Sequence, residues 1–275
     1  MVEIETLAAR DGTALLTRRW PPAGEPWATL LVVHGLGEHS GRHEATAGRF
    51  AAAGIATASY DHRGFGASAG RRADVERWAS FLDDIEDRLA ASRLAGLPAA
   101  IYGHSLGGLL VADYLLDDRP LPDAAVLSAP ALGAKVNPAL RLALPLLATI
   151  LPRVAIANPW DGAALSRDPA IGAAVAVDPL CESRTSFRLG NGIFRAMDRV
   201  RSRLAGRGGF PLPVLLVHGG ADPLVPTETS AFAGAYASVE RRVYPDVRHE
   251  LHHDPVDGAR IVDEMTDWLR ERLLG

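Results

Sequence analysis

Short, continuous hydrophobic runs alternate along most of the chain with segments whose apolar residues recur at intervals of three and four. Runs of the first kind are typical of strands buried on both faces of a parallel sheet. The second spacing is typical of amphipathic helices that cover such a sheet, for example Phe81, Leu82, Ile85 and Leu89 after Trp78. The runs that predict buried strands are Ala28–Val33, Ile55–Tyr60, the run from Ala99 to the next glycine, Ala124–Leu127, Val214–Val217 and Glu240–Tyr244.

Other segments complete this pattern. Two alternating stretches, Val2–Leu7 and Ala14–Trp20, predict a hairpin that turns at Asp11 and Gly12. Helices are expected after most of the buried runs, because strands that alternate with helices are typical of a mainly parallel sheet with both faces covered. The remaining predicted helices are Arg42–Ala53, a helix from Trp78 to near Gly96, Glu228–Tyr236, and a closing helix that contains Ile261, Met265, Trp268, Leu269 and Leu273.

The alternation stops in the middle of the chain. From about Leu132 to Val200 there is little strand signal, and apolar helical pieces are separated by prolines. Because strand and helix alternate again from Val214, this interruption indicates an insertion into one domain. We predict a core made of residues 1–130 and 201–275, and an inserted helical cap made of residues 131–200.

Composition narrows the class of protein. The chain has 275 residues, 48% of them hydrophobic, and a net charge of −4, so no basic surface for nucleic acid is expected. Cys181 is the single cysteine, and the first residues lack the basic and apolar regions of a signal peptide, so we expect a cytoplasmic protein. The longest apolar stretch, Ala139–Leu151, is interrupted by Arg141 and Pro145 and is too short to cross a membrane.

The most informative motif is G-x-S-x-G at Gly103–Gly107, which stands between a predicted strand and a predicted helix. This is the context that a nucleophile elbow requires. Glycines two residues to either side of Ser105 permit a turn too tight for side chains, and the start of the following helix favours developing negative charge. The motif therefore predicts Ser105 as a nucleophile.

A serine nucleophile needs a base and a carboxylate that orients it. In the chain order Ser, Asp, His, the acid is expected after a late strand and the base after the last strand. Asp222 follows the run Val214–Val217, and His249 follows Tyr244, so we predict Ser105, Asp222 and His249 as the triad. Asp222 could instead shape a turn before a proline. Asp246 is an alternative candidate for the acid, and His252 or His253 is an alternative candidate for the base. The stretch that contains these two histidines is otherwise expected to be solvated.

Two backbone amides are expected to bind the oxyanion. One is the N–H of Leu106, directly after the nucleophile, and the other is the N–H of Leu36, in the glycine-rich turn after the strand Ala28–Val33. His34, at the end of that strand, is expected to support the turn rather than to take part in the chemistry. The alternative interpretation of this segment is a simple glycine-rich turn.

Another pattern competes with this interpretation. The segment His249-Glu250-x-x-His253 matches H-E-x-x-H, which in zinc hydrolases places both histidines on one face of a helix. Pro245 and Pro255 leave room for barely two turns, so the zinc hydrolase is kept as a remote alternative. Cys181 lacks the context of a nucleophile and is expected to be a packing residue. No metal or organic cofactor is predicted.

Together these segments resemble the monoacylglycerol lipase-like branch of the α/β-hydrolases, also described as serine aminopeptidase-type or lysophospholipase-like. The resemblance implies an α/β-hydrolase fold with a mostly parallel eight-stranded sheet, helices on both faces, and a cap over an apolar acyl tunnel with a polar exit for glycerol. It agrees with His249 as the base and with Leu36 and Leu106 as the oxyanion donors. It is weakest over Gly133–Asn158, in the cap. The stretches that carry it are His34–Arg42, Tyr60–Ser68, Gly103–Gly108, Leu127–Pro130, Ser166–Pro169, His218–Pro226 and Tyr244–His252.

The sequence therefore predicts a serine carboxylester hydrolase whose expected substrate is a monoacylglycerol. A lysophospholipase or a broad carboxylesterase with the same triad is the alternative, and a non-catalytic ligand-binding member of the fold is a remote one. The apolar segment Ala139–Leu151 is expected to line the acyl site, and it could also make transient contact with membranes or micelles. The sequence does not determine the oligomeric state.

Overall fold

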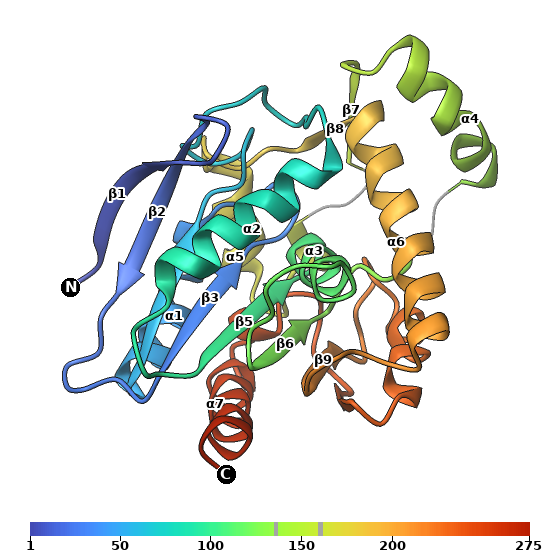
Figure 1. Cartoon of the computed structure of the whole chain (residues 1–275). Coiled ribbons are helices and arrows are strands. Elements are labelled where there is room, and N and C mark those ends of the chain that lie inside the picture. Colours follow the sequence, from blue (N-terminus) through green and yellow to red (C-terminus); the bar gives the residue numbers. More distant parts are fainter. Residues whose placement is uncertain (135–136, 159–161) are drawn as a thin grey trace.

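The computed structural model describes residues 1–134, 137–158 and 162–275 and is built on one eight-stranded sheet (Figure 1). The strand order is β1-β2-β4-β3-β5-β6-β9-β10, and only the pairings of β1 with β2 and of β2 with β4 are antiparallel. The predicted α/β-hydrolase sheet is thus confirmed. The strands are β1 Glu3–Ala8, β2 Ala14–Trp20, β3 Ala28–Val33, β4 Ile55–Tyr60, β5 Ala99–His104, β6 Ala124–Ser128, β9 Val214–Gly219 and β10 Val239–Tyr244.

Both faces of the sheet are buried. Leu31 and Val33 of β3 pack into one hydrophobic core, and Leu30 and Val32 pack into another on the opposite face. This is why the central strands are continuously hydrophobic in the sequence. Helices α2 (Trp78–Ser92), α3 (Leu106–Leu115) and α6 (Phe187–Arg207) contribute to the first core, whereas α1 (Glu44–Ala52) and α7 (Gly258–Leu274) contribute to the second.

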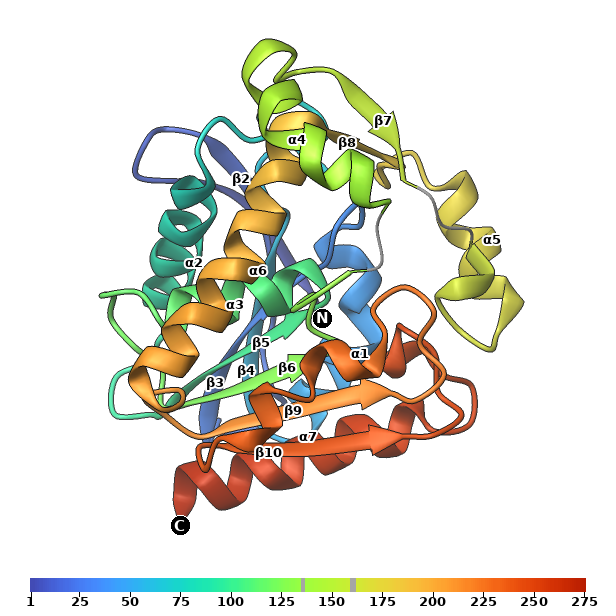
Figure 2. The same ribbon diagram turned by 90° about the vertical axis from the view of Figure 1, so that its right-hand side faces the viewer.

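The chain between β6 and β9 forms a cap beyond one end of the sheet (Figure 2). Its described elements are α4 (Pro138–Ile150), β7 (Ala155–Ala157), the short turn η2 (Gly162–Ala164), α5 (Pro169–Val177), β8 (Arg184–Ser186) and α6. The two-stranded sheet of β7 and β8 was not predicted, because strands of three residues carry too little periodic signal. Residues 135–136 and 159–161 of the predicted cap lie outside the described residues.

Helix α6 joins the cap to the body. The predicted boundary at residue 200 falls inside this helix, which continues to Arg207. Its Arg199 donates hydrogen bonds to the buried carboxylate of Asp113 on α3, with Arg199 Nε 3.0 Å from Asp113 Oδ1. Since a buried charge is stable only when paired, this ion pair fixes α6 against the core.

The predicted helix Glu228–Tyr236 is wrong. The segment forms two separate 3-10 turns, η3 (Thr227–Ser230) and η4 (Ala233–Ala235). The hydroxyl of Thr229 donates to the carbonyl of Pro226 at 2.7 Å, and that of Ser230 donates to the carbonyl of Thr227 at 3.0 Å. Such local bonds from side chain to backbone compete with the regular bonds of an α-helix. Two other predicted helices differ only at their ends: a 3-10 turn, η1 (Ser40–His43), precedes α1, and α2 ends at Ser92.

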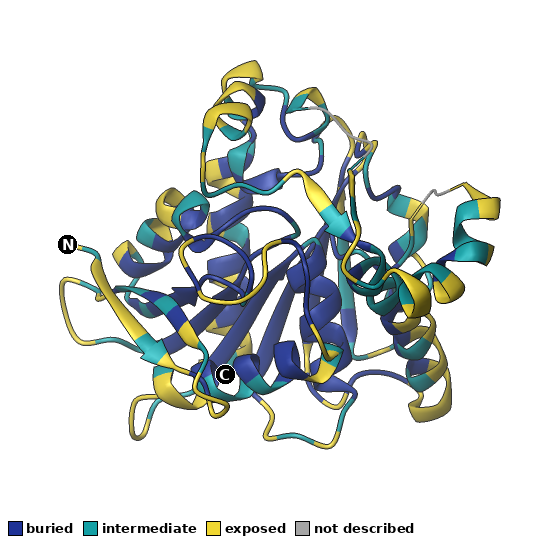
Figure 3. Cartoon of the chain, turned by 90° about the horizontal axis from the view of Figure 1, so that it is seen from above, coloured by how far each residue is buried: buried dark blue, intermediate teal, exposed yellow. Residues whose placement is uncertain are grey.

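Much of the outer cap surface is exposed, while the central strands are buried (Figure 3). On α4 the side chain of Leu144 is only 5% exposed, whereas Leu142 is 84% exposed and Leu146 and Ile150 are also exposed. No described helix is both long enough and apolar enough to cross a membrane.

The turn from β5 to α3 is the tightest connection in the core. Ser105, between them, has φ 53° and ψ −115°, a conformation that costs a non-glycine residue free energy. A Cβ on Gly107 would overlap the carbonyl oxygens of Val33 and His34 at the end of β3. Glycine is therefore required at 107 because α3 starts directly against β3.

We expect Gly107→Ala to lower the free energy of unfolding by about 3 kcal/mol, because the added methyl meets rigid backbone on two sides. Gly48→Ala is the matched control: Gly48 lies inside α1, and its added methyl would meet no atom within 4 Å. This control should raise stability by about 0.5–1 kcal/mol. Chemical denaturation of both variants measures the difference, and equal stabilities would contradict the close packing described above.

Candidate active site

Ser105, His249 and Asp222 come from three different loops, each of which follows a strand, and they form one hydrogen-bonded chain. The hydroxyl of Ser105 donates to Nε2 of His249 at 2.9 Å, and Nδ1 of His249 donates to Oδ2 of Asp222 at 2.7 Å. Ser105 stands at the start of α3, Asp222 follows β9, and His249 lies between β10 and α7. The structure thus brings together the three residues that the sequence predicted, in the geometry that a serine nucleophile needs.

The electrostatic surroundings suit this arrangement. Burial alone lowers the pKa of His249, but the charge and hydrogen bond of Asp222 outweigh it, so the net pKa of His249 is raised above 6.5. Burial tends to raise the pKa of Asp222, but the charge of His249 and the hydrogen bonds that Asp222 accepts lower it well below the usual range. Asp222 is therefore ionised at neutral pH and favours the imidazolium that forms when Ser105 loses its proton.

His218 is a site residue whose role the sequence analysis missed. It is fully buried at the end of β9, and its Nε2 lies 2.7 Å from the carbonyl oxygen of Val225 and 3.4 Å from Oδ2 of Asp222. Its Nδ1 lies 2.8 Å from the hydroxyl of Ser230. The other oxygen of Asp222 accepts hydrogen bonds from the backbone amides of Leu224 and Val225 at 2.8 and 2.9 Å. His218 thus ties the loop of the acid to η3, and its spacing of four residues before Asp222 was the available signal.

The two predicted oxyanion amides flank Ser105. Within the described residues, the N–H groups of Leu36 and Leu106 make no hydrogen bond outside the regular bonds of helices and strands. A Cβ built on Gly35 would lie 3.1 Å from Cβ of Ser105, so the loop that carries Leu36 passes directly beside the serine. His34 supports this loop as expected: its Nδ1 is 2.8 Å from the carbonyl oxygen of Gly35, and its Nε2 accepts from the backbone amide of His62.

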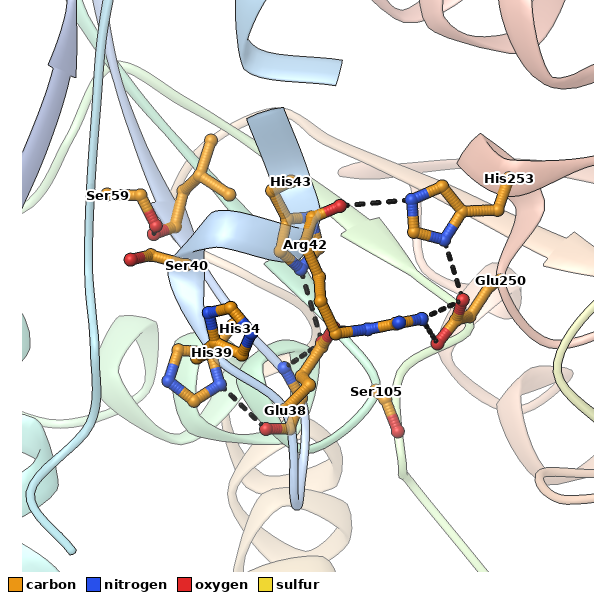
Figure 4. Close-up of polar contacts among 12 residues, drawn as sticks. His34, Glu38, His39, Ser40, Arg42, His43, Ser59, Ser105, Glu250 and His253 are labelled. Atoms are coloured by element: carbon orange, nitrogen blue, oxygen red, sulfur yellow. Dashed lines mark hydrogen bonds and ion pairs between the residues drawn. The ribbon is translucent and has the colours of Figure 1, made fainter. Parts of the chain in front are cut away.

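A buried network of charges holds the same loop (Figure 4). Oε1 of Glu38 accepts from the amide of Gly35 at 2.5 Å and contacts Nε2 of His43 at 3.1 Å. Arg42 lies between Glu38, at 3.4 Å, and Glu250, whose two oxygens it binds at 2.8 and 2.6 Å. Because every charge in this network is largely buried, removing one would leave another unpaired in a low-dielectric environment.

The rival residues of the loop after β10 occupy other positions. Asp246 is exposed. His253 donates from Nε2 to the carbonyl of Arg42 at 3.0 Å and contacts Glu250 through Nδ1 at 2.6 Å, and His252 is buried among aromatic rings. The expectation of a solvated stretch is therefore wrong, because the short turn after Glu250 folds both histidines inward.

The zinc pattern does not assemble in the way it predicts. Only a 3-10 turn, η5 (Leu251–His253), follows His249, and both ring nitrogens of His249 already face Ser105 and Asp222. Among the described residues, ligand atoms lie within 4.8 Å of one another in two groups, His39 with Asp178 and Cys181, and Glu250 with His252 and His253. Neither group contains His249. Arg42 already occupies the oxygens of Glu250, so a second cation there would be repelled.

Cys181 is not poised as a nucleophile. It is half-buried near Arg42, and burial raises the pKa of its thiol to about 12. Because the thiolate is the reactive form, this environment fits the packing role that the sequence predicted.

A cavity of about 360 Å³ opens over Ser105 and lies between the core and the cap. Most of its lining is apolar and comes from the cap, including Leu144 of α4, Ile156 of β7 and Met197 of α6. Near Ser105 and His249 the lining is polar, with Glu38, Arg42 and Glu250 grouped together. The site therefore offers an apolar compartment and a hydrogen-bonding compartment on the two sides of one nucleophile.

Comparison with known proteins gives a consistent result. Residues 24–256 match the model of the family described as serine aminopeptidase, S33. The chain is 32% identical to a monoacylglycerol lipase of Mycolicibacterium smegmatis, over 98% of this chain and 97% of that protein. It is 30% identical to the monoglyceride lipase of Homo sapiens, over 98% and 91%. Among solved structures, a monoacylglycerol lipase of Paleococcus ferrophilus superposes with a TM-score of 0.84 at 28% identity, covering 94% of this chain and 99% of that one.

The raised pKa of His249 predicts a specific pH dependence. His249 must be neutral to accept the proton of Ser105, so kcat/KM should fall as the pH drops through a single ionisation above 6.5. Asp222→Asn removes the charge that raises this pKa, so the acid limb should move to lower pH while kcat drops by about 10⁴-fold. Hydrolysis of a short, soluble ester measures both effects. Asp246→Asn, in an exposed position of the neighbouring loop, should leave the profile unchanged.

The contact of His218 with Asp222 leads us to expect that replacing His218 lowers kcat. His218→Leu should lower kcat by about 10-fold to 100-fold, the equivalent of one hydrogen bond to a charged group, because the acid loses a neighbour that fixes its orientation. KM for a short ester should not change, since His218 is not in the lining of the cavity. His218→Gln keeps a donor and should recover part of kcat. Equal activity of all three proteins at saturating substrate would show that His218 does not position Asp222.

Proposed function

Because the chain belongs to the serine aminopeptidase (S33) family of α/β-hydrolases, we propose that it is a serine ester hydrolase that cleaves monoacylglycerols into fatty acid and glycerol. The observation that carries this proposal is the hydrogen-bonded chain Ser105–His249–Asp222 at the floor of a cavity with one apolar and one polar compartment. The names of two relatives that align over nearly the whole chain, monoacylglycerol lipase and monoglyceride lipase, support the same substrate.

In the proposed acylation step, Ser105 attacks the ester carbonyl while His249 accepts its hydroxyl proton. The carbonyl π electrons move onto the oxygen, and the resulting oxyanion accepts hydrogen bonds from the amides of Leu36 and Leu106, each worth about 3 kcal/mol in the transition state. Collapse of the tetrahedral intermediate breaks the bond to glycerol, which takes the proton from His249. Asp222 holds the imidazole in the tautomer that this transfer requires.

In the deacylation step, His249 removes a proton from water, and the hydroxide attacks the acyl carbon of the ester on Ser105. The same two amides stabilise the second oxyanion, and the fatty acid leaves as Ser105 regains its proton from His249. The proton transfer between Ser105 and His249 uses atoms that already lie 2.9 Å apart. The proposed mechanism needs no metal and no organic cofactor.

The two compartments of the cavity suit the two halves of a monoacylglycerol. The apolar lining of the cap offers the acyl chain a dry surface, and burial of each methylene group is worth about 0.8 kcal/mol. Outward-facing residues of α4, such as Leu142 and Leu146, are available for transient contact with lipid aggregates. At the polar end, two carboxylates with one guanidinium give an excess of acceptors for the hydroxyl groups of glycerol.

The same polar end argues against a lysophospholipid. Burial tends to raise the pKa of Glu38 and Glu250, but their histidine and arginine partners lower it, so both are ionised at neutral pH. A phosphodiester headgroup would meet two carboxylates and only one arginine there, and like charges in a partly buried site are costly. A neutral alcohol is therefore favoured over a phosphate as the leaving group.

Labelling with a fluorophosphonate tests the nucleophile. The wild-type protein should react, and Ser105→Ala should neither react nor hydrolyse esters, whereas Ser68→Ala, at a serine outside the cavity lining, should behave as wild type. Substrates are then compared in one panel of monoacylglycerol, diacylglycerol, triacylglycerol and lysophosphatidylcholine. We expect monoacylglycerol to give the highest kcat/KM. Label retained by Ser105→Ala would refute the nucleophile, and faster cleavage of lysophosphatidylcholine would refute the substrate.

The acyl compartment is tested on α4 in the same experiment. Leu144→Asp places a charge inside the cavity and should lower kcat/KM for a long-chain soluble ester at least about 10-fold more than for an acetate ester. Leu142→Asp is the matched control, because this leucine is on the same helix but faces outward. Equal losses on both esters in Leu144→Asp would contradict an acyl-binding role for the cap.

A further inference from the structure

A second cavity, of about 510 Å³, lies where the core meets the cap. Lining residues come from the start of α2, the segment before β7 and the start of α6, and Figure 1 shows these parts of the chain near one another. Five arginines and three acidic residues line the cavity, so its lining is net positive in a chain whose net charge is −4. None of its lining residues lines the cavity over Ser105. The arginines are Arg63, Arg71, Arg77, Arg153 and Arg188, and the acids are Asp11, Asp74 and Glu76.

Two of the five arginines are committed to ion pairs. Arg63 binds Asp84 through two nitrogens at 2.7 Å and contacts Asp11 at 2.8 Å. Arg188 binds both oxygens of Asp74, which also accepts from the hydroxyl of Ser186 at 2.7 Å. These pairs neutralise most of the acidic lining and join the start of α6 to the core.

The other three arginines keep donors free. Arg77 has no ion-pair or hydrogen-bond partner for its side chain among the residues that the structure describes. Arg71 only approaches Asp74, at 4.0 Å, and that carboxylate is already bound by Arg188. Arg153 contacts the exposed carboxylate of Glu76 at 3.5 Å. Three exposed arginines whose charge is little neutralised therefore line one cavity.

The start of α2 adds further donors. Its N-cap residue, Arg77, has no side-chain acceptor for the helix, and the first turn contains no acidic residue. The free N–H groups of this turn and the helix dipole favour an anion. Ser80, in the same turn, is only 5% exposed and lines the cavity, yet its hydroxyl has no hydrogen-bond partner in the described part of the chain. The hydroxyl oxygen is not fully enclosed, so it is available to a ligand in the cavity.

We propose that this cavity binds a phosphate group through Arg71, Arg77, Arg153, the hydroxyl of Ser80 and the start of α2. Guanidinium groups bind phosphate oxygens through paired hydrogen bonds, and helix N-termini are recurrent phosphate sites. The volume leaves room for more than one phosphate or for a substituent on it. The group can belong to a free phosphate compound or to the headgroup of an anionic lipid, and the two sources present the same oxygens.

A bound phosphate would join the cap to the core. Arg153 belongs to the cap segment between α4 and β7, whereas Arg71, Arg77 and Ser80 belong to the core. Ile156 and Ala157 of β7, a few residues after Arg153, line the substrate cavity. Binding therefore restrains the part of the cap nearest the acyl compartment. Because the ligand binds only the folded protein, it should also raise the melting temperature as its concentration increases.

Titration with pyrophosphate at low ionic strength tests the proposal by calorimetry and by thermal melting. We expect wild type to bind and to melt at a higher temperature, and the double variant Arg71→Ala/Arg77→Ala to bind at least about 10-fold more weakly. Arg207→Ala is the matched control, because Arg207 is exposed at the end of α6 and far from the cavity in sequence. Sodium chloride at matched ionic strength separates binding from screening. The double variant should keep its hydrolysis of a short ester, which shows that it folds.

Vesicles distinguish the two sources of phosphate. Co-sedimentation with phosphatidylglycerol–phosphatidylcholine vesicles that is lost in the double variant supports a lipid headgroup, and binding of pyrophosphate alone supports a free phosphate compound. No binding of either probe by wild type would overturn the proposal. Equal binding of either probe by the double variant and by Arg207→Ala would also overturn it, because the response would then reflect net charge only.

Discussion

The contact of the β5–α3 turn with the end of β3 is the constraint on which the site depends. It places Ser105 at φ 53°, above the N-terminus of α3 and beside the loop that carries Leu36. Because the neighbouring parallel strands β3 and β5 end at the same edge of the sheet, this one packing contact sets the relative positions of Ser105 and of the loop that carries Leu36. The strain at Ser105 is maintained by the buried sheet on both sides of the turn, which leaves the turn no room to relax.

Buried charged side chains hold the loop after β3 in place. Glu38 binds the amide of Gly35, and Arg42 joins Glu38 to Glu250, the residue after His249. Such charges are costly to bury and are retained only where they are paired on several sides. The consequence is that the loop after β3 and the loop that carries His249 are connected through one set of side chains.

The cap supplies most of the apolar lining of the cavity over Ser105. It places few charges toward this cavity and carries apolar residues on both its inner and its outer side, as Leu144 and Leu142 illustrate on one helix. Ion pairs join it to the core at several points, Arg167 with Asp254, Arg188 with Asp74 and Arg199 with Asp113.

The sequence by itself indicated which segments form the core strands, the two-sided burial of β3 and β4, the inserted segment, and Ser105, Asp222 and His249 as the candidate triad. These features depend on local periodicity and on chain order, which a linear sequence contains in full. Only the tertiary structure decided that residues 228–236 form two short turns, that β7 pairs with β8, that His252 is buried and His253 half-buried, and that His218 lies against Asp222. The same is true of the arginines around Ser80, which come from separate segments. Burial and pairing of polar side chains depend on residues that are distant in the chain, and a local sequence pattern does not show which of these residues become neighbours.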